Sequence, residues 1–213
     1  MRLVFLFCLS ILSFNVASVM AMDGQIPENS SEAEIRNLLG KRLIRATLAR
    51  NQEKVLTLLN QGADINYPSS LGLTPLHWAA SNNWVEGTSL LISRNADVNP
   101  VNRWGNTPLM MSILKGTATV SLLISADADV NVINREGKTA LWIASSERLS
   151  KMVQLLLKQD AVLGPAQLSR EAMNFLENEK QKQELENCLG QGTVKDAQPI
   201  PHELIQLISS FKS

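Results

Sequence analysis

Cysteine and histidine are scarce in this chain of 213 residues, which has two of each. Cys8 lies in an apolar run at the N-terminus, and Cys188 lies in a polar stretch near the other end. If the N-terminal run is removed, Cys188 is the only thiol left and no disulfide can close within the chain. No cysteine-rich metal site can be drawn from this inventory, and we predict no bound metal.

Catalytic motifs are missing as well. The sequence contains no glycine-rich phosphate loop, no His-Glu-x-x-His pair, no serine nucleophile elbow and no pairing of cysteine with histidine. The two histidines are His77 and His202, and His77 falls in a recurring turn where a structural role is expected. We therefore predict that the chain is not an enzyme and takes no cofactor.

A net charge of either sign is also absent, because 20 lysines and arginines balance 20 aspartates and glutamates. Without a global field, the chain has no general attraction for nucleic acid or for an anionic membrane surface. Aromatic residues make up only 5% of the chain, while small and aliphatic residues dominate. This composition suits thin helices that pack closely together.

What the sequence does have is an internal repeat. The frame Gly-x-Thr-Pro-Leu, with Ala for Pro in the last copy, begins at Gly72, Gly105 and Gly137, which are 33 and then 32 residues apart. A second marker, Ala-Asp-Ile/Val-Asn, ends six residues before each of these glycines. Glycine suits a turn that needs positive φ, threonine suits a helix N-cap, and proline suits the first helical position. Two short helices should follow each frame, and stacking must bury their apolar faces.

The repeat resembles the ankyrin repeat, whose Thr-Pro-Leu-His-x-Ala signature and 33-residue period match residues 72–80 closely. The resemblance covers residues 41–163 and implies an all-α solenoid of helix-turn-helix units joined by β-hairpin-like loops. About four repeats are expected. The segment 43–66 aligns without a gap onto 76–99 but lacks the Thr-Pro-Leu-His start, so it is interpreted as an N-terminal capping repeat.

Departures from the family pattern predict where the stack is weak. The family's histidine, which ties one turn to the next, is present only as His77, with Met110 and Trp142 in its place in the next two units. The third unit is one residue short near 116–118, just before its second helix. Gly87 stands where a β-branched residue is usual, and it should weaken its helix by about 1 kcal/mol. The recurring aspartates are expected to bond local backbone.

The N-terminus carries the features of an export signal. A basic start, the apolar run from Leu3 to Phe14 and small residues before Ala21 predict a signal peptide over 1–21, cleaved after Ala21. The alternative is an uncleaved anchor, although the apolar run is short for a bilayer span. We therefore expect a periplasmic or secreted protein that meets the membrane only during export. A lead-in follows over 22–40, in which Ser31 and Glu34 form a capping box for a helix.

The segment after the repeats predicts two further helices. A C-terminal capping helix is expected within 164–189, from Ala166 to Leu189, with the charged run from Glu177 to Glu186 interpreted as a solvated face. A linker and an amphipathic helix occupy 190–213. Residues 200–211 resemble the opening helix of F-box motifs, which recruit ubiquitin-ligase scaffolds. The alternative is a helix that folds back onto the stack or remains a tail.

The resemblance implies a protein that binds another protein through hairpin tips and first helices. The candidate binding residues are Leu71, Leu73, Asn82, Arg103, Trp104, Asn106, Lys115, Arg135, Glu136 and Lys138. Trp104 beside Arg103 is the expected anchor, because binding hot spots favour both residue types. The alternative is that the Trp104 ring lies flat on a neighbouring repeat. Three functions stay open: an exported protein-binding module, an exported adaptor that recruits ubiquitin-ligase machinery, and a structural periplasmic scaffold.

Overall fold

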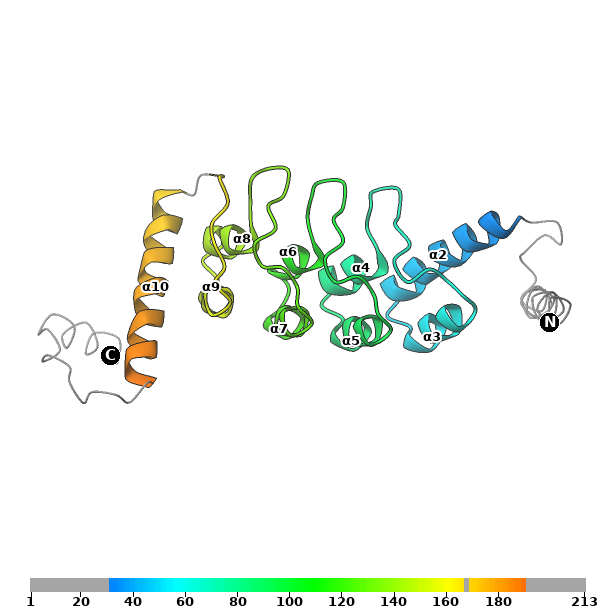
Figure 1. Ribbon diagram of the computed structural model, residues 1–213, viewed down its shortest axis with the longest axis horizontal. Helices are drawn as coiled ribbons and strands as arrows, with labels where there is room; N and C mark the ends of the chain where they lie inside the picture. Colours follow the sequence, from blue (N-terminus) through cyan, green and yellow to red (C-terminus); the bar gives the residue numbers. More distant parts are fainter. Residues whose placement is uncertain (1–30, 167–168, 191–213) are drawn as a thin grey trace, which may run out of the picture.

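The computed structural model describes residues 31–166 and 169–190, and every element in this part of the chain is a helix (Figure 1). The helices are α2 (Glu32–Leu48), α3 (Gln52–Asn60), α4 (Pro75–Ser81), α5 (Val85–Ser93), α6 (Pro108–Ser112), α7 (Thr117–Ser125), α8 (Ala140–Ser146), α9 (Ser150–Leu157) and α10 (Arg170–Gly190). None of them is long and apolar enough to cross a membrane. The predicted signal peptide and the residues from 191 onward lie outside the described part.

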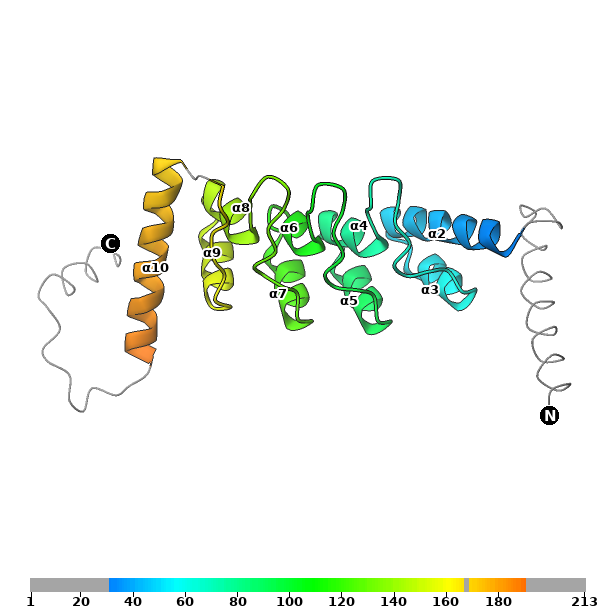
Figure 2. The same cartoon turned by 45° about the horizontal axis from the view of Figure 1, so that its top comes forward.

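Four helix pairs stack side by side into an elongated solenoid, as predicted. Helices α2, α4, α6 and α8 form an inner row, and α3, α5, α7 and α9 form an outer row (Figures 1 and 2). Three loops, which we call the fingers, project from the stack: residues 67–73, 100–106 and 132–138. Each finger is closed by a backbone hydrogen bond, such as Asn102 N–H to the Asn106 carbonyl at 3.1 Å. The fingers are therefore hairpin-like.

A threonine starts each inner helix after the first. Thr74, Thr107 and Thr139 have extended backbones, and their hydroxyls accept the N–H of the residue three positions later at 3.5, 3.3 and 3.2 Å. Each bond satisfies one of the amides that a helix start leaves without a partner. The prediction of threonine N-caps is confirmed, including at the third frame, where Ala140 replaces proline.

The Ala-Asp-x-Asn marker bonds each unit to itself and to the next. The Asp97 carboxylate accepts the Asn99 N–H at 3.0 Å, which confirms the expected local role of the aspartates. The Asn99 amide oxygen then accepts the N–H of Asp129, in the following unit, at 2.8 Å. The same bond recurs from Asn66 to Asp97 and from Asn131 to Val162. The second marker is thus a ladder of hydrogen bonds that fixes the spacing of the stack.

The lead-in and the first repeat helix are one element. Ser31 and Glu34 form the predicted capping box, with reciprocal bonds of 2.8 and 3.3 Å. Helix α2 then continues to Leu48 without a break at the expected boundary after residue 40. Gly40 remains helical and buried because the Tyr67 ring packs on it, so close that an added Cβ would lie 2.1 Å from a ring carbon. The absence of a side chain at Gly40 therefore makes room for the Tyr67 ring.

Gly87 has the same role in α5. An added Cβ would lie 2.0 Å from the ring of Trp84, whose side chain is buried at the start of the helix. The sequence pattern predicted only a helix weakened by glycine. The structure adds the reason for it, because a larger residue would displace the Trp84 ring from the core.

Helix α10 closes the C-terminal end of the stack by packing against α9 and α8 (Figure 1). It begins at Arg170 rather than at Ala166, which lies in a bend. The interpretation of its charged run as a solvated face is wrong at Glu179 and at the uncharged Gln183, both of which are buried. Glu179 is 1% exposed and accepts hydrogen bonds from Gln154 Nε2 and Lys182 Nζ, at 2.9 and 2.8 Å. A bonded carboxylate therefore joins the cap to α9.

Candidate protein-binding surface

We call the fingers together with the exposed side of the inner helices the binding face. Six of the ten predicted residues are exposed there: Leu71, Arg103, Trp104, Lys115, Arg135 and Glu136. Asn82, Asn106 and Lys138 are half-buried, and Leu73 is buried. The predicted residues thus divide into exposed ones that a partner could contact and ones whose side chains already pack within the scaffold.

Trp104 lies at the tip of the second finger with 46% of its surface exposed. Its backbone is held firmly, because its N–H donates to the Asn102 side chain at 2.9 Å and its carbonyl accepts the Arg135 N–H at 3.0 Å. The second bond links the second finger to the third. The backbone of Trp104 is therefore already fixed while its ring is exposed to solvent. Binding a partner through this ring would cost little further backbone entropy.

Leu73 does not belong to the binding face. Only 4% of it is exposed, and its N–H and carbonyl both bond Ser69 across the base of the first finger. Asn106, at the equivalent position of the second finger, is also engaged: its side-chain oxygen accepts the Asn134 amide at 2.7 Å. Leu73 was assigned to the binding residues by analogy with hairpin tips. This assignment was wrong, because its side chain turns into the core.

The third finger carries an ion pair between its tip and its base. Lys138 Nζ lies 2.6 Å from a Glu136 carboxylate oxygen and 4.4 Å from the centroid of the Trp142 ring. Both charges are partly solvated, so the pair contributes little to stability. It does neutralise Glu136. The charge that remains unpaired at this tip is that of Arg135, which is exposed.

The middle of each inner helix also contributes a side chain to the binding face, and these residues were not among those predicted from the sequence. Trp78, Met111 and Ile143 occupy the x position of the Thr-Pro-Leu-His-x-Ala frame and are half-buried on the binding face. Helical periodicity could have identified them, since this position is the one that points away from the buried Leu76 and Ala79. The Trp78 indole N–H is itself buried and has no hydrogen-bond partner among the described residues.

Charge is distributed unevenly over the stack although the chain is neutral overall. The exposed cations of the binding face are Arg45, Arg103, Lys115 and Arg135. Opposing them there are Glu136, which is paired with Lys138, and Glu147 at the end of α8. The marker aspartates, by contrast, are exposed at the bases of the fingers. Exposed cations therefore outnumber exposed carboxylates among these residues of the binding face.

His77 offers no catalytic group to this surface. It is fully buried, with Nδ1 3.1 Å from the Thr74 N–H and Nε2 3.0 Å from the Asn106 carbonyl oxygen. Burial lowers its pKa, while the bond to Asn106 and the charge of Asp97 oppose the shift. Within the described ranges, no group of three or more potential ligands could hold a metal ion.

Comparison with known proteins identifies the repeat. A family model described as "Ankyrin repeats (3 copies)" matches residues 43–134 and again 89–165. Over 74 residues the chain is 35% identical to "Serine/threonine-protein kinase 12" of Arabidopsis thaliana, a match that spans 35% of this chain and 16% of that protein. Over 60 residues it is 37% identical to "Ankyrin repeat protein OPG189" of Monkeypox virus, spanning 28% of this chain and 11% of that protein. Each match covers only a small part of the relative.

Proposed function

Since the chain belongs to the ankyrin repeat family, whose repeats are generally non-catalytic modules for protein interactions, we propose that it holds a partner protein on its binding face. The main support for the proposal is the exposure of side chains on the fingers. The fingers expose large side chains that the fold does not use, while the buried residues of the same repeats account for the stability of the stack. An exposed set of this kind on a rigid scaffold is typical of an interaction site.

Trp104 is the anchor of the proposed interface. Leu71 occupies the equivalent tip of the first finger and is 40% exposed, so two large apolar side chains stand on neighbouring tips. Arg103 is exposed beside Trp104 and supplies a guanidinium to the rim. Tryptophan and arginine dominate binding hot spots because they bury a large area and make several contacts at once.

Paired substitutions test this surface against the opposite one. The proposal predicts that Trp104→Ala with Arg103→Ala weakens binding of an identified partner by at least about tenfold, equivalent to about 1.4 kcal/mol. The matched control is Glu86→Ala with Arg94→Ala, two exposed residues of the outer row. Binding is measured by isothermal titration, and circular dichroism checks that both variants are folded. Equal affinities for the two variants would show that the surface is wrongly chosen.

We also propose that the chain is exported, which rests on residues 1–21 alone. The apolar run and the small residues before Ala21 support this proposal. Intact-mass measurement on chain recovered outside the cytoplasm should give a species that begins at Met22. A full-length chain retained in the membrane would instead favour a tethered scaffold.

A further inference from the structure

Exposed large apolar side chains are concentrated on the fingers. Of the eight in the described part of the chain, four lie there: Leu71, Val101, Trp104 and Ile133. Val101 and Ile133 occupy the same position in neighbouring fingers, two residues after the marker asparagine, and are 56% and 54% exposed. Side chains this exposed contribute little to the core of the stack. Apolar residues gathered in this way are typical of an interaction surface.

Each of these two aliphatic residues shares one side of its finger with an arginine. Val101 and Arg103 are exposed, while Asn102 between them is buried. The same alternation recurs at 133–135, where Asn134 is the buried residue. Successive side chains of an extended segment point to opposite sides, so the residues on either side of the asparagine share a side. The second and third fingers therefore each present an aliphatic side chain together with a guanidinium.

Trp104 lies between the two arginines. Arg103 precedes it in the chain, and the backbone N–H of Arg135 donates to its carbonyl at 3.0 Å. An equivalent bond joins the Arg103 N–H to the Leu71 carbonyl at 3.0 Å, so backbone hydrogen bonds connect all three tips. The order arginine, tryptophan, arginine is thus fixed by the backbone. The surface that we call the tip patch consists of Val101, Arg103, Trp104, Ile133 and Arg135.

The positive charge of the tip patch is not neutralised within the described residues. Neither Arg103 nor Arg135 has an ion-pair partner there. The one carboxylate in these two fingers is that of Glu136, and it lies 2.6 Å from Lys138 Nζ. Burying an unpaired charge at an interface is costly. A partner that covers the three apolar side chains must therefore also supply acidic groups for the two arginines.

We propose that the tip patch binds an extended segment of the partner protein in which two apolar residues lie between two carboxylates. This inference rests on the proposed function and gives the chemistry of the partner at the same surface. Neighbouring helices pack about 8–10 Å apart, so equivalent arginines on neighbouring fingers are separated by about one such step. Three residues of an extended chain span about 10 Å. The order acid, apolar, apolar, acid therefore matches the spacing of the patch.

The chain's own termini are the competing occupants. Residues 200–211 have Glu203 as their only acidic side chain, so they can pair with one of the two arginines. Residues 22–30 carry Asp23 and Glu28, but they join the start of α2, which projects beyond the stack and away from the second and third fingers (Figure 1). A separate segment that brings two carboxylates meets both charges, which favours the partner as the occupant.

The test uses a synthetic peptide as the probe, titrated into the ¹⁵N-labelled full chain and followed by NMR. The peptide contains Glu-Leu-Phe-Glu, and its controls replace either Leu-Phe by Ala-Ala or both glutamates by lysine. The amides of Trp104, Gly105 and Arg135 should shift with the acidic apolar peptide. Either control should bind at least about tenfold more weakly. Raising the salt from about 20 to about 200 mM should weaken the acidic peptide, because salt screens exposed charges.

A charge swap makes the assignment specific. Arg103→Glu with Arg135→Glu should weaken the acidic peptide at least about tenfold and should bind the lysine peptide in its place. Unfolding cannot produce this gain, so the result separates lost charge from lost structure. The matched control is Arg94→Glu with Lys151→Glu, which makes the same change of charge at two exposed positions of the outer row and should leave both affinities unchanged.

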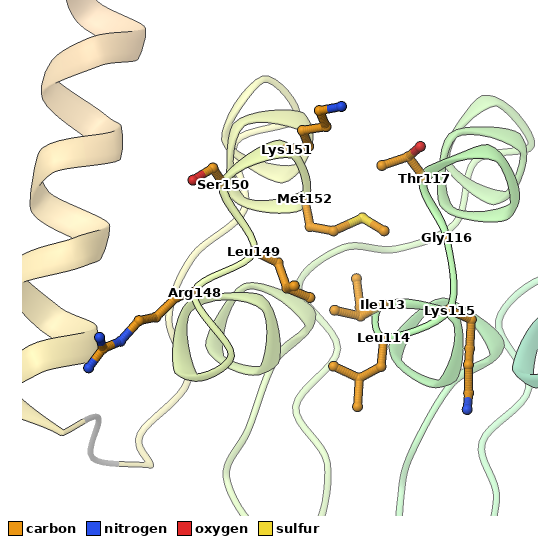
Figure 3. Close-up of a pocket in the computed structure, with 10 residues that line it drawn as sticks. All are labelled: Ile113, Leu114, Lys115, Gly116, Thr117, Arg148, Leu149, Ser150, Lys151 and Met152. Atoms are coloured by element: carbon orange, nitrogen blue, oxygen red, sulfur yellow. The ribbon is translucent and has the colours of Figure 1, made fainter. Parts of the chain in front are cut away.

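The pocket between the third and fourth repeats is the other apolar recess that the peptide can reach. It has a volume of about 420 Å³, and Ile113, Leu149 and Met152 are among the residues that line it (Figure 3). Peptide-induced shifts confined to the amides of 113–117 and 149–152 would place the peptide there and overturn the proposal. Equal binding of the acidic and lysine peptides would also overturn it.

Two further outcomes concern the occupant and the proposed function. If Asp23→Asn, Glu28→Gln and Glu203→Gln together raise the affinity for the acidic peptide more than about tenfold, a terminus of the chain already covers the patch and the proposal is overturned. If the charge swap leaves the acidic peptide unaffected while Trp104→Ala with Arg103→Ala still weakens an identified partner, the acidic chemistry is wrong and the proposed function stands.

Discussion

The Nε2 atom of His77 lies 3.0 Å from the carbonyl oxygen of Asn106, which belongs to the finger of the next repeat. On its other side the ring accepts the Thr74 N–H at Nδ1. These partners define a neutral imidazole with its proton on Nε2. A single buried side chain thus caps its own helix and ties one repeat to the next.

The burial of His77 makes stability depend on pH. Because burial lowers its pKa below the ordinary 6.5, the unfolded chain binds more protons than the folded chain once the pH falls to that value. The free energy of unfolding should therefore be highest above about pH 6.5 and should decrease as the pH falls through and below it. Urea unfolding at several pH values between 5 and 8 measures this dependence. His77→Gln should be less stable at pH 8 but should show a flatter profile, and an equally steep profile in the variant would contradict the assignment.

Gly87→Ala should destabilise the stack although alanine is the better helix former. The added Cβ collides with the buried Trp84 ring, and displacing it should cost about 1–3 kcal/mol. Ser89→Ala, at an exposed position of the same helix, should change stability by less than about 0.5 kcal/mol. Chemical denaturation of both variants measures the difference. If Gly87→Ala were stabilising, helix propensity would outweigh the packing of Trp84.

Trp142 replaces the missing histidine of the fourth repeat. Its Nε1 donates to the Ala166 carbonyl at 3.1 Å, which holds the segment leading into α10. Trp142→Phe keeps an aromatic ring near Lys138 but removes the donor, so it should cost about 0.5–1.5 kcal/mol and increase amide exchange in α10. Met110→Leu is the matched control, because Met110 is the buried counterpart in the third repeat. Unchanged exchange of α10 in Trp142→Phe would exclude this role.

Interactions between residues close together in the sequence allowed much of the fold to be predicted. The threonine caps, the capping box at Ser31 and the turn aspartates were foreseen because each depends on residues within about four positions. The repeat period then dictated the stacking. These signals recur in the chain and reinforce one another.

Contacts between distant residues were not foreseen. The Tyr67 ring on Gly40, the Trp142 bond to Ala166 and the buried Glu179 each join segments more than twenty residues apart. The inward turn of Leu73 was missed because the tip pattern does not reveal side-chain direction. The one-residue deficit near Gly116 was visible in the sequence, whereas the close approach of the Asn83 side chain to this glycine was not.

Hydrogen–deuterium exchange of the chain bound to its partner locates the partner on the stack. Pull-down with the full chain supplies the partner, and exchange is compared with and without it. If the partner lies on the binding face, new protection should appear in the fingers, above all at 103–106 and 135–138, and none in the exposed turns of α5 and α9. Protection confined to the outer row, with the fingers unchanged, would contradict it.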